Sequence, residues 1–380
     1  MKRNLILTPG PTQVPPELCE ILGRPIIHHR TPQFQQYLKE AVEGLKYVMQ
    51  TSNNVYLMAS SGTGAMEASV VSFCSPGDKV ITVEGGKFGE RWTEIAKANG
   101  LDPQVIEVEW GKAVDPKVIE KLLQQDSDIK AVYITLCETS TGMTPDIAAI
   151  GGIVEKTGAI LVVDAVSGLG VVDLKTDAWS VDVVASGSHK GFMLPPGVGC
   201  VSVSLKAAKL METAKCPGYY FDLKKYAKAG EKTDTPFTPA IGIVIALTES
   251  LKMFKEAGLE NFFQHYTRLA KGLRAGIAAL GLELFAQDAG ASDVLTAVKV
   301  PDTVDGGELV KIMRDTYGIT IAGGQGHLKG KIFRIAHMGC LDEYDMLTGL
   351  SCLEKVLNEL GYKFDLGAGV AAAQEYFNKN

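Results

Sequence analysis

Two side chains with reactive chemistry follow apolar segments that are typical of buried strands. Lys190 closes the segment Ser186-Gly187-Ser188-His189-Lys190, directly after the apolar run 181–185. A lysine held between glycines at a strand end can form an imine with an aldehyde if its surroundings lower the pKa of its amine. Asp164 ends the apolar run 159–163 and would place a carboxylate at the same edge of a sheet. An exposed lysine and a turn-capping aspartate are the ordinary alternatives.

A glycine-rich turn forms a candidate anion site between the apolar segment 55–58 and a helical pattern. It consists of Ser61, Gly62, Thr63 and Gly64. Unpaired amides and the positive dipole end of a helix favour a phosphate, and glycine lets it approach closely. A tight turn with a Ser or Thr N-cap is the alternative. Glu67 stands where a dinucleotide fingerprint needs its third glycine, although Glu84 at a later strand end leaves a nicotinamide site open.

A single arginine lies among apolar residues near the carboxyl end of the chain. Arg334 belongs to the segment Lys331-Ile332-Phe333-Arg334-Ile335-Ala336, which predicts a strand. Its guanidinium would form bidentate hydrogen bonds with a carboxylate. That carboxylate would come either from a ligand or from an acidic side chain in an internal salt bridge. The anion turn, Asp164, Lys190 and Arg334 together match one cofactor, pyridoxal 5′-phosphate. A nicotinamide cofactor would leave Lys190 and Arg334 without a role.

The elements that must position these residues alternate between strands and helices, which predicts an α/β fold with a doubly wound, mainly parallel sheet. The expected strands are 55–58, 79–83, 104–108, 131–135, 159–163, 182–185 and 199–203. Amphipathic crossover helices are expected at 88–99, 116–125 and 146–156. Ligands of such sheets collect at the carboxyl ends of the strands, where the turn, Asp164 and Lys190 stand.

The alternation of short apolar runs with helical patterns ends after residue 204, which predicts a second, smaller domain. A Pro-, Gly-, Tyr- and Lys-rich segment, 217–239, leads into long helical patterns at 241–254 and 259–280. Strands near 294–300 and 332–336 and helices near 306–317 and 342–360 indicate an α+β unit, followed by a terminal helix. We therefore divide the chain into an N-terminal arm, 1–16, a large cofactor-binding domain, 17–250, and a small C-terminal domain, 251–380.

Composition excludes several classes of protein. The 380 residues are 46% hydrophobic and 22% charged, which is ordinary for a globular chain, and a net charge of −6 without a basic stripe argues against nucleic-acid binding. No apolar stretch approaches the roughly 20 residues of a membrane span, and the N-terminal apolar run is too short for a signal peptide. Seven scattered cysteines without a CxxC pair predict reduced thiols in the cytoplasm and no metal site.

The sequence resembles the class V aminotransferases of pyridoxal-phosphate fold type I, in particular the alanine-glyoxylate and serine-pyruvate branch. The resemblance covers nearly the whole chain. It is carried by segments 7–12, 61–68, 89–92, 138–142, 164–167, 186–190, 235–239 and 333–335, which occur in the same order. The resemblance implies a large seven-stranded sheet domain, a smaller α+β domain, pyridoxal 5′-phosphate as cofactor and a homodimer with shared active sites.

The resemblance also implies roles for individual residues. Lys190 would bind the cofactor covalently, and Asp164 would pair with its pyridine nitrogen. Ser61, Gly62, Thr63, Gly64 and His189 would hold the phosphate; Phe88 would stack on the ring; Thr139 would meet the phenolic oxygen; Thr235 and Thr238 would reach the phosphate of the neighbouring subunit; and Arg334 and Gly10 would bind the substrate. Core packing is the alternative for Phe88, and turn capping is the alternative for both threonines.

The implied reaction is transfer of an amino group from alanine or serine to glyoxylate or pyruvate in a ping-pong cycle. Lys190, released by the incoming amino acid, would move the proton from the substrate α-carbon, while Asp164 keeps the ring protonated. A 2-aminoethylphosphonate aminotransferase is the nearest rival, and a nicotinamide dehydrogenase is a more distant one. A cysteine desulfurase is disfavoured because segment 322–330 has no thiol. A redox-complex subunit would need clustered metal ligands, which the sequence lacks.

Overall fold

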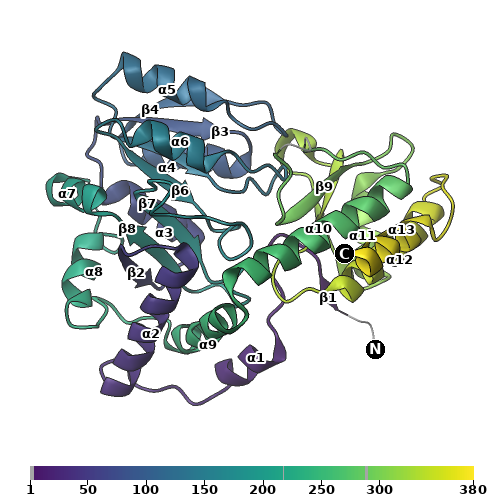
Figure 1. Ribbon diagram of the computed structural model, residues 1–380, viewed down its shortest axis with the longest axis horizontal. Coiled ribbons are helices and arrows are strands. Elements are labelled where there is room, and N and C mark those ends of the chain that lie inside the picture. Colours follow the sequence, from purple (N-terminus) through teal and green to yellow (C-terminus); the bar gives the residue numbers. More distant parts are fainter. Residues whose placement is uncertain (1–3, 217, 287–289) are drawn as a thin grey trace.

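The computed structural model describes residues 4–216, 218–286 and 290–380, and its largest element is a seven-stranded sheet (Figure 1). The strand order is β2-β8-β7-β6-β5-β3-β4. These strands are β2 (Asn54–Met58), β3 (Lys79–Glu84), β4 (Asp102–Glu107), β5 (Ala131–Thr135), β6 (Ile160–Asp164), β7 (Val183–Gly187) and β8 (Gly199–Val203). All seven predicted strands are confirmed, because runs of β-branched and small apolar residues suit strands that are buried on both faces.

The sheet is parallel apart from β8, which pairs antiparallel with both β2 and β7. The carboxyl ends of the other six strands therefore lie at one edge. Asp164 is the last residue of β6, and Lys190 follows β7 by three residues. In the register of the sheet, Asp164 is paired with Ala185 of β7. The topology thus brings two residues that are far apart in sequence to adjacent strand ends.

Helices cover both faces of the sheet. Leu161 and Val163 pack into the core beneath α2, α5, α6 and α9, whereas Ile160 and Val162 pack on the opposite face against α3, α4, α7 and α8. The helices are α2 (Pro32–Met49), α3 (Gly62–Val71), α4 (Lys87–Ala98), α5 (Pro116–Gln125), α6 (Ile147–Val154), α7 (Leu205–Thr213), α8 (Leu223–Gly230) and α9 (Ile241–Ala257). This three-layer arrangement follows from the alternation of side chains along each strand.

A smaller α+β unit follows the long helix α10 (Leu259–Ala279) (Figure 1). Its antiparallel sheet has the order β11-β12-β9. The elements are β9 (Leu295–Lys299), α11 (Gly306–Asp315), β10 (Ile319–Thr320), β11 (Ala322–Gly323), a 3-10 turn (Gly326–Leu328), β12 (Ile332–Ala336), α12 (Glu343–Glu359) and α13 (Ala368–Lys379). The predicted strands and helices of this unit are confirmed. The predicted boundary at residue 250 falls within α9, and the division of the chain into domains stays a prediction.

The N-terminal arm connects the two parts of the molecule. Strand β1 (Leu5–Ile6) pairs in parallel with β10, and the side chains of Leu5 and Leu7 are buried in the core of the small unit. The arm then passes over the large sheet, where the amide of Thr12 donates to the His189 carbonyl at 3.2 Å, and enters α1 (Pro16–Leu22). The arm is therefore anchored at both ends, and its middle residues lie over the strand edge that carries Lys190.

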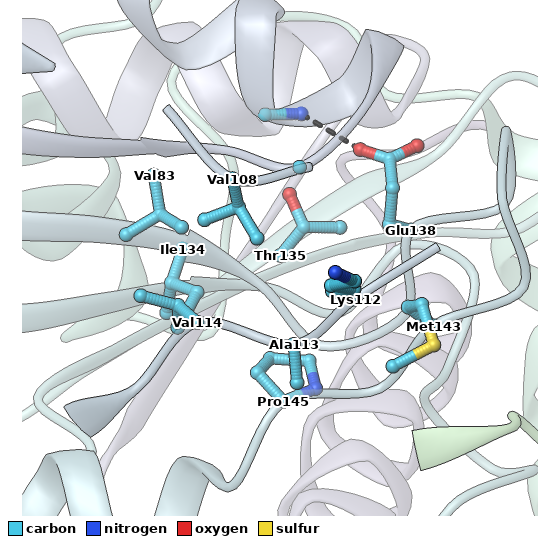
Figure 2. Close-up of a pocket in the computed structure, with 12 residues that line it drawn as sticks. Val83, Val108, Lys112, Ala113, Val114, Ile134, Thr135, Glu138, Met143 and Pro145 are labelled. Carbon is cyan, nitrogen blue, oxygen red and sulfur yellow. Dashed lines mark hydrogen bonds between the residues drawn. The ribbon is translucent and has the colours of Figure 1, made fainter. Parts of the chain in front are cut away.

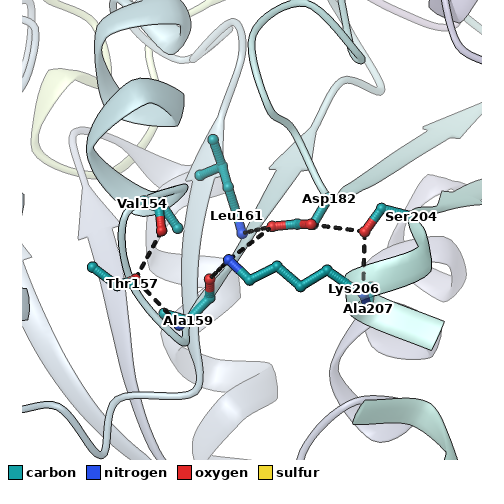
Figure 3. A network of polar contacts seen from close by, with 8 residues as sticks. All are labelled: Val154, Thr157, Ala159, Leu161, Asp182, Ser204, Lys206 and Ala207. Atoms are coloured by element: carbon teal, nitrogen blue, oxygen red, sulfur yellow. Dashed lines mark hydrogen bonds and ion pairs between the residues drawn. The ribbon is translucent and has the colours of Figure 1, made fainter. Parts of the chain in front are cut away.

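A network of polar contacts lies at the amino ends of β6 and β7, on the side of the sheet away from Lys190 (Figure 3). Asp182, just before β7, accepts from the Leu161 amide at 3.0 Å and from the Ser204 hydroxyl at 2.7 Å. Lys206 forms an ion pair with Asp182 at 3.8 Å and donates to the Ala159 carbonyl. Each polar group here has a partner from the chain itself. These bonds tie the amino ends of β6 and β7 to the start of α7.

Candidate active site

Lys190 lies under the N-terminal arm with only 7% of its surface exposed. Burial lowers the pKa of its amine to about 8, and the nearby carboxylate of Asp164 opposes that shift. The amine donates to the carbonyl of Pro9, and the hydroxyl of Thr12 donates to the Lys190 carbonyl at 2.9 Å. A side chain at Gly10 would overlap the Lys190 side chain. The structure therefore places Gly10 against Lys190, and its predicted role in substrate binding stays a prediction.

Asp164 is 3% exposed, and its carboxylate accepts from the Val166 amide at 2.9 Å. Burial raises the pKa of this carboxyl to about 6, with the charge of Glu138 adding to the rise and those of Arg91 and Lys190 opposing it. An aspartate whose pKa lies near neutrality is suited to share a proton with a basic ring nitrogen. The predicted pair of Asp164 and Lys190 is thus brought together in one buried site.

The N-terminus of α3 lies at the same strand edge. Ser61 occupies the N-cap position without a side-chain cap bond, although a capping Ser or Thr is the usual arrangement. Added side chains at Gly62 and Gly64 would come within 2.5 Å of Val166 and 2.6 Å of Ser60, respectively, so both glycines are needed for close packing. The Nδ1 atom of the neighbouring His189 is buried and has no partner among the described residues.

The N-terminus of α4 differs, because the chain itself fills it. The amides of Phe88 and Gly89 donate to one oxygen of Glu138 at 3.0 and 2.9 Å, and the Lys87 amide donates to the Ser140 hydroxyl at 3.1 Å. Phe88 is half-buried, and the guanidinium of Arg91 lies 4.8 Å from the centre of its ring. Arg91 also donates to the Thr63 hydroxyl at 3.3 Å, which links the two helix ends.

A small cavity lies behind Glu138 (Figure 2). Its volume is about 30 Å³, enough for one water molecule, and apolar side chains such as Val83, Val114 and Ile134 line it together with Thr135. The dashed line in Figure 2 is the hydrogen bond from the Gly89 amide to Glu138, whose carboxylate points away from the cavity. This cavity is too small for a cofactor or a substrate.

Arg334 lies in β12 of the small unit with 5% of its surface exposed. Its guanidinium donates twice to the Gly323 carbonyl, at 3.0 and 2.7 Å, and once to the Thr139 carbonyl at 2.6 Å. The internal salt bridge that the sequence left open is not found within the described ranges. Five N–H groups minus these three bonds leave two N–H groups for a ligand carboxylate. Burial lowers the pKa of Arg334 to about 10, and the group remains a cation at neutral pH.

Thr235 and Thr238 lie elsewhere, in the segment before α9. The Thr235 hydroxyl donates to the Phe237 carbonyl at 2.8 Å, and Asp234 beside it pairs with Arg30. A cavity of about 420 Å³ between α2, β2 and α8 borders Thr235, and Thr238 is exposed. No described contact joins either threonine to Lys190 or Asp164 within one chain. Their predicted role toward a neighbouring subunit stays a prediction.

Two residues near the site were not predicted as functional from the sequence. Arg91 follows Phe88 by three residues and so shares its helix face, a spacing that would have identified it. Glu138 precedes Thr139, but its contacts with α4 arise from residues about fifty positions away and leave no local pattern. Across residues 4–216, 218–286 and 290–380, no group of three or more His, Cys, Asp or Glu side chains is placed to hold a metal ion, and no helix is long and apolar enough to cross a membrane.

Comparisons with known proteins identify the family. The class-V aminotransferase family matches residues 20–336. The chain is 45% identical to the soluble hydrogenase 42 kDa subunit of Anabaena cylindrica, over 98% of each chain. It is 39% identical to L-aspartate–glyoxylate aminotransferase of Paracoccus denitrificans, over 99% of this chain and 97% of the relative.

A solved structure agrees with these sequence matches. The ureidoglycine–glyoxylate aminotransferase of Bacillus subtilis superimposes with a TM-score of 0.94 at 30% identity, covering 100% of this chain and 99% of the other. The fold is therefore that of the type I pyridoxal-phosphate enzymes. The chain belongs to the class-V aminotransferase family, because the family model matches residues 20–336 and the fold agrees.

Proposed function

We propose that the protein is a pyridoxal 5′-phosphate-dependent aminotransferase that moves the amino group of alanine or serine to glyoxylate or pyruvate. The observation that carries this proposal is the pair of buried groups at one strand edge, Lys190 with a pKa lowered to about 8 and Asp164 with a pKa raised to about 6. The relatives from Paracoccus denitrificans and Bacillus subtilis both have glyoxylate in their names, which supports glyoxylate as the acceptor.

The chain's residues fit this cofactor. The α3 N-terminus has no side-chain cap bond, the glycines at 62 and 64 leave no room for side chains, and the Nδ1 atom of His189 is buried and unpartnered in the described structure. These features suit a phosphate, which Thr63 and Ser61 would help to hold. Phe88 would stack on the ring, and Asp164 would face the ring nitrogen. Thr139 would meet the phenolic oxygen.

The cofactor supplies an electron sink for the negative charge that develops on the substrate α-carbon. The chain does the rest. Lys190, whose lowered pKa leaves far more of its amine unprotonated at neutral pH than in an ordinary lysine, would take the α-proton and return it. Asp164 would keep the ring nitrogen protonated from a buried position. The two spare N–H groups of Arg334 would hold the substrate carboxylate, with the backbone at Gly10 on the other side.

A homodimer with shared active sites is part of the proposal. Thr235 and Thr238 would reach the phosphate of the neighbouring subunit, which fits their position away from Lys190 in their own chain and the cavity of about 420 Å³ beside Thr235. We also propose a cytoplasmic location, because the seven cysteines, all within the described residues, are scattered along the chain and form no disulfide with one another.

The test combines a spectrum with chemical trapping. Protein isolated with the cofactor supplied should absorb in the visible, lose that band when L-alanine or L-serine is added, and carry a borohydride-stable adduct on the peptide of Lys190. Lys190→Ala should lose the adduct and at least about 10⁴-fold of the transamination rate, because both the covalent link and the proton carrier are removed. Lys206→Ala is the control, since Lys206 is a partly buried lysine at the opposite sheet edge.

Normal transamination by Lys190→Ala, or an adduct on another lysine, would refute the assignment. The rival donor is tested in the same assay. If 2-aminoethylphosphonate is consumed faster than alanine and serine, the protein is a phosphonate aminotransferase, and Arg334 then binds a phosphonate instead of the donor's carboxylate.

A further inference from the structure

Glu138 is a buried carboxylate for which the proposed chemistry has no use. It is 6% exposed and follows β5 by three residues. Besides the two α4 amides, it accepts from the Ser140 amide at 3.1 Å and from the Ser140 hydroxyl at 2.5 Å. With these four bonds, both carboxylate oxygens are engaged by the chain itself. Glu138 therefore has no oxygen directed at a substrate or a cofactor.

The charge of Glu138 is held mainly by hydrogen bonds, and the guanidinium of Arg334 interacts with it electrostatically without direct contact. None of the described lysines or arginines forms an ion pair with it. Burial raises the pKa of this carboxyl, and the hydrogen bonds from Ser140, Gly89 and Phe88 oppose that rise. The positive end of the α4 dipole faces the carboxylate as well. A buried ion of this kind is costly unless every lone pair is satisfied, so its bonds must stay intact for the local structure to persist.

Three ligand-facing parts of the site meet at this carboxylate. The first turn of α4 carries Phe88 and, one turn on, Arg91, which reaches Thr63 of the phosphate cradle. The residue after Glu138, Thr139, offers its carbonyl to Arg334 at 2.6 Å. Arg334 comes from the small unit, so the segment 138–140 joins the large sheet, α4 and the substrate anchor. A shift of Glu138 would move Phe88 and Arg334 together.

We propose that Glu138 is a positioning residue for two groups, the cofactor-stacking side chain Phe88 and the carboxylate anchor Arg334. It would hold Phe88 through its bonds to the α4 amides, and Arg334 through its bonds to Ser140, which fix the segment that carries the Thr139 carbonyl. This inference rests on the proposed function for what Phe88 and Arg334 bind. It adds that one residue outside ligand contact controls the affinity for both ligands.

The chain offers a matched control in Glu354. This glutamate is 3% exposed and also fills a helix N-terminus, accepting from the amides of Gly367 and Val370 at 2.6 and 3.0 Å at the start of α13. Its contacts are confined to the small unit and reach none of the site residues described above. Glu138 and Glu354 thus both accept from the amides at the start of a helix. They differ because only Glu138 lies beside residues of the candidate site.

The experiment compares Glu138→Gln with Glu354→Gln. Glutamine keeps the size but turns one acceptor oxygen into a donor, which leaves at least one amide unpaired in each variant. Both variants should lose comparable stability in urea unfolding. Only Glu138→Gln should weaken binding of pyridoxal 5′-phosphate to the apoprotein, followed by absorbance titration, by about tenfold or more. It should also raise KM for the oxo acid by a similar factor and change kcat less.

Hydrogen exchange gives a readout that needs no cofactor. Glu138→Gln should speed amide exchange in the peptide covering 86–92, and Glu354→Gln in the peptide covering 367–370. Equal cofactor affinity and equal KM in the two variants would overturn the proposal and make Glu138 a purely structural cap. If Glu138→Gln does not fold, Ser140→Ala replaces it and should shift affinity and KM in the same direction by a smaller factor; no shift overturns the proposal.

The two proposals fail in distinguishable ways. A wild-type protein that takes up no cofactor and forms no adduct at Lys190 contradicts the proposed function, whatever Glu138 does. A wild-type protein that binds the cofactor normally, with Glu138→Gln unchanged in affinity and KM, contradicts only the positioning role.

Discussion

Two helices begin at the carboxyl edge of the large sheet, and their N-termini are treated in opposite ways. At α3, Ser61 stands at the N-cap without a side-chain cap bond, and the glycines at 62 and 64 are packed closely against Val166 and Ser60. At α4, the amides of the first three residues are bound by Glu138 and Ser140. Arg91 reaches from one helix to the other. One end is left for a ligand, and the other is closed by the chain.

The difference shows where an anion can bind. Every helix N-terminus has unpaired amides and a positive dipole end, so the helix alone does not distinguish the two. At α4 a buried carboxylate already supplies the negative charge, and a phosphate there would be repelled. At α3 no carboxylate of the described residues binds the first amides, which suits the phosphate that we propose there. An internal anion at one helix thus directs the external anion to the other.

The largest effect on cofactor affinity is expected from placing a carboxylate at the N-terminus of α3. Thr63→Asp places a carboxylate at the exposed start of α3, imitating α4. Affinity of the apoprotein for pyridoxal 5′-phosphate should fall by about 100-fold or more, because two negative charges would share one cradle. Stability should hold or rise by about 0.3–1 kcal/mol, since acidic residues are favourable at a helix N-terminus. Absorbance titration and thermal unfolding measure the two effects.

Thr63→Ser is the control for this variant and should bind the cofactor within a few-fold of wild type, because it keeps the hydroxyl. If Thr63→Asp retains normal affinity, the α3 end is not the phosphate site and the comparison between the two helices fails.

A smaller effect should follow from disturbing the filled end. A methyl group at Gly86 would lie 2.5 Å from the Cγ and Cδ atoms of Glu138 and would force the carboxylate away from the α4 amides. Gly86→Ala should lower the free energy of unfolding by about 1–3 kcal/mol, the range for overpacking. It should also weaken cofactor binding several-fold. The control is Gly152→Ala in α6, where an added methyl group meets no atom within 4 Å and should hold or raise stability.

The effect of Gly86→Ala on cofactor affinity decides whether the bonds at the start of α4 serve the binding site or only the fold. Loss of stability with unchanged cofactor affinity would mean that the α4 cap supports the fold alone, and that Phe88 tolerates displacement of its helix end.

The smallest effect on cofactor affinity is expected at Arg91, which connects the N-termini of α3 and α4. Arg91→Gln removes the cation over Phe88 and its bond to Thr63. Cofactor affinity should fall by less than about tenfold, since Arg91 is only partly buried and its charge is screened by solvent. Wild type should lose affinity as salt rises from low to high, and Arg91→Gln should lose less. An identical salt dependence in both proteins would show that Arg91 does not contribute to anion binding.

Much of the framework could be predicted because its signals are local. Buried strands such as β5 and β6 read as continuous apolar runs, and their residues were placed within one position at each end. The start of α2 at Thr31-Pro32 follows from side-chain capping and the fixed φ of proline, and the Thr31 side chain accepts from the Phe34 amide. Polar residues directly after such strands mark the ligand edge, which is why Asp164 and Lys190 stand out from their neighbours.

The partners of Arg334 could not be predicted, because they are backbone carbonyls supplied by distant segments. A sequence shows which side chains are charged and not which carbonyls will face them, so the sequence left open an internal carboxylate or a ligand carboxylate. Within the chain the partners are the carbonyls of Gly323 and Thr139. The closure of the arm over Lys190 is hidden for the same reason: the contact is between the amine and the carbonyl of Pro9, 181 residues away.

The sequence by itself determined the order of strands and helices, the glycine turn at α3, and the buried acid and lysine at neighbouring strand ends, since apolar periodicity and turn chemistry act over a few residues. Only the tertiary structure decided that Glu138 caps α4 while α3 has no side-chain cap bond, and that Arg334 donates to the carbonyls of Gly323 and Thr139. Those outcomes depend on which polar groups from distant segments lie beside a buried donor in the folded chain, because most buried donors must be paired and the sequence does not show with what.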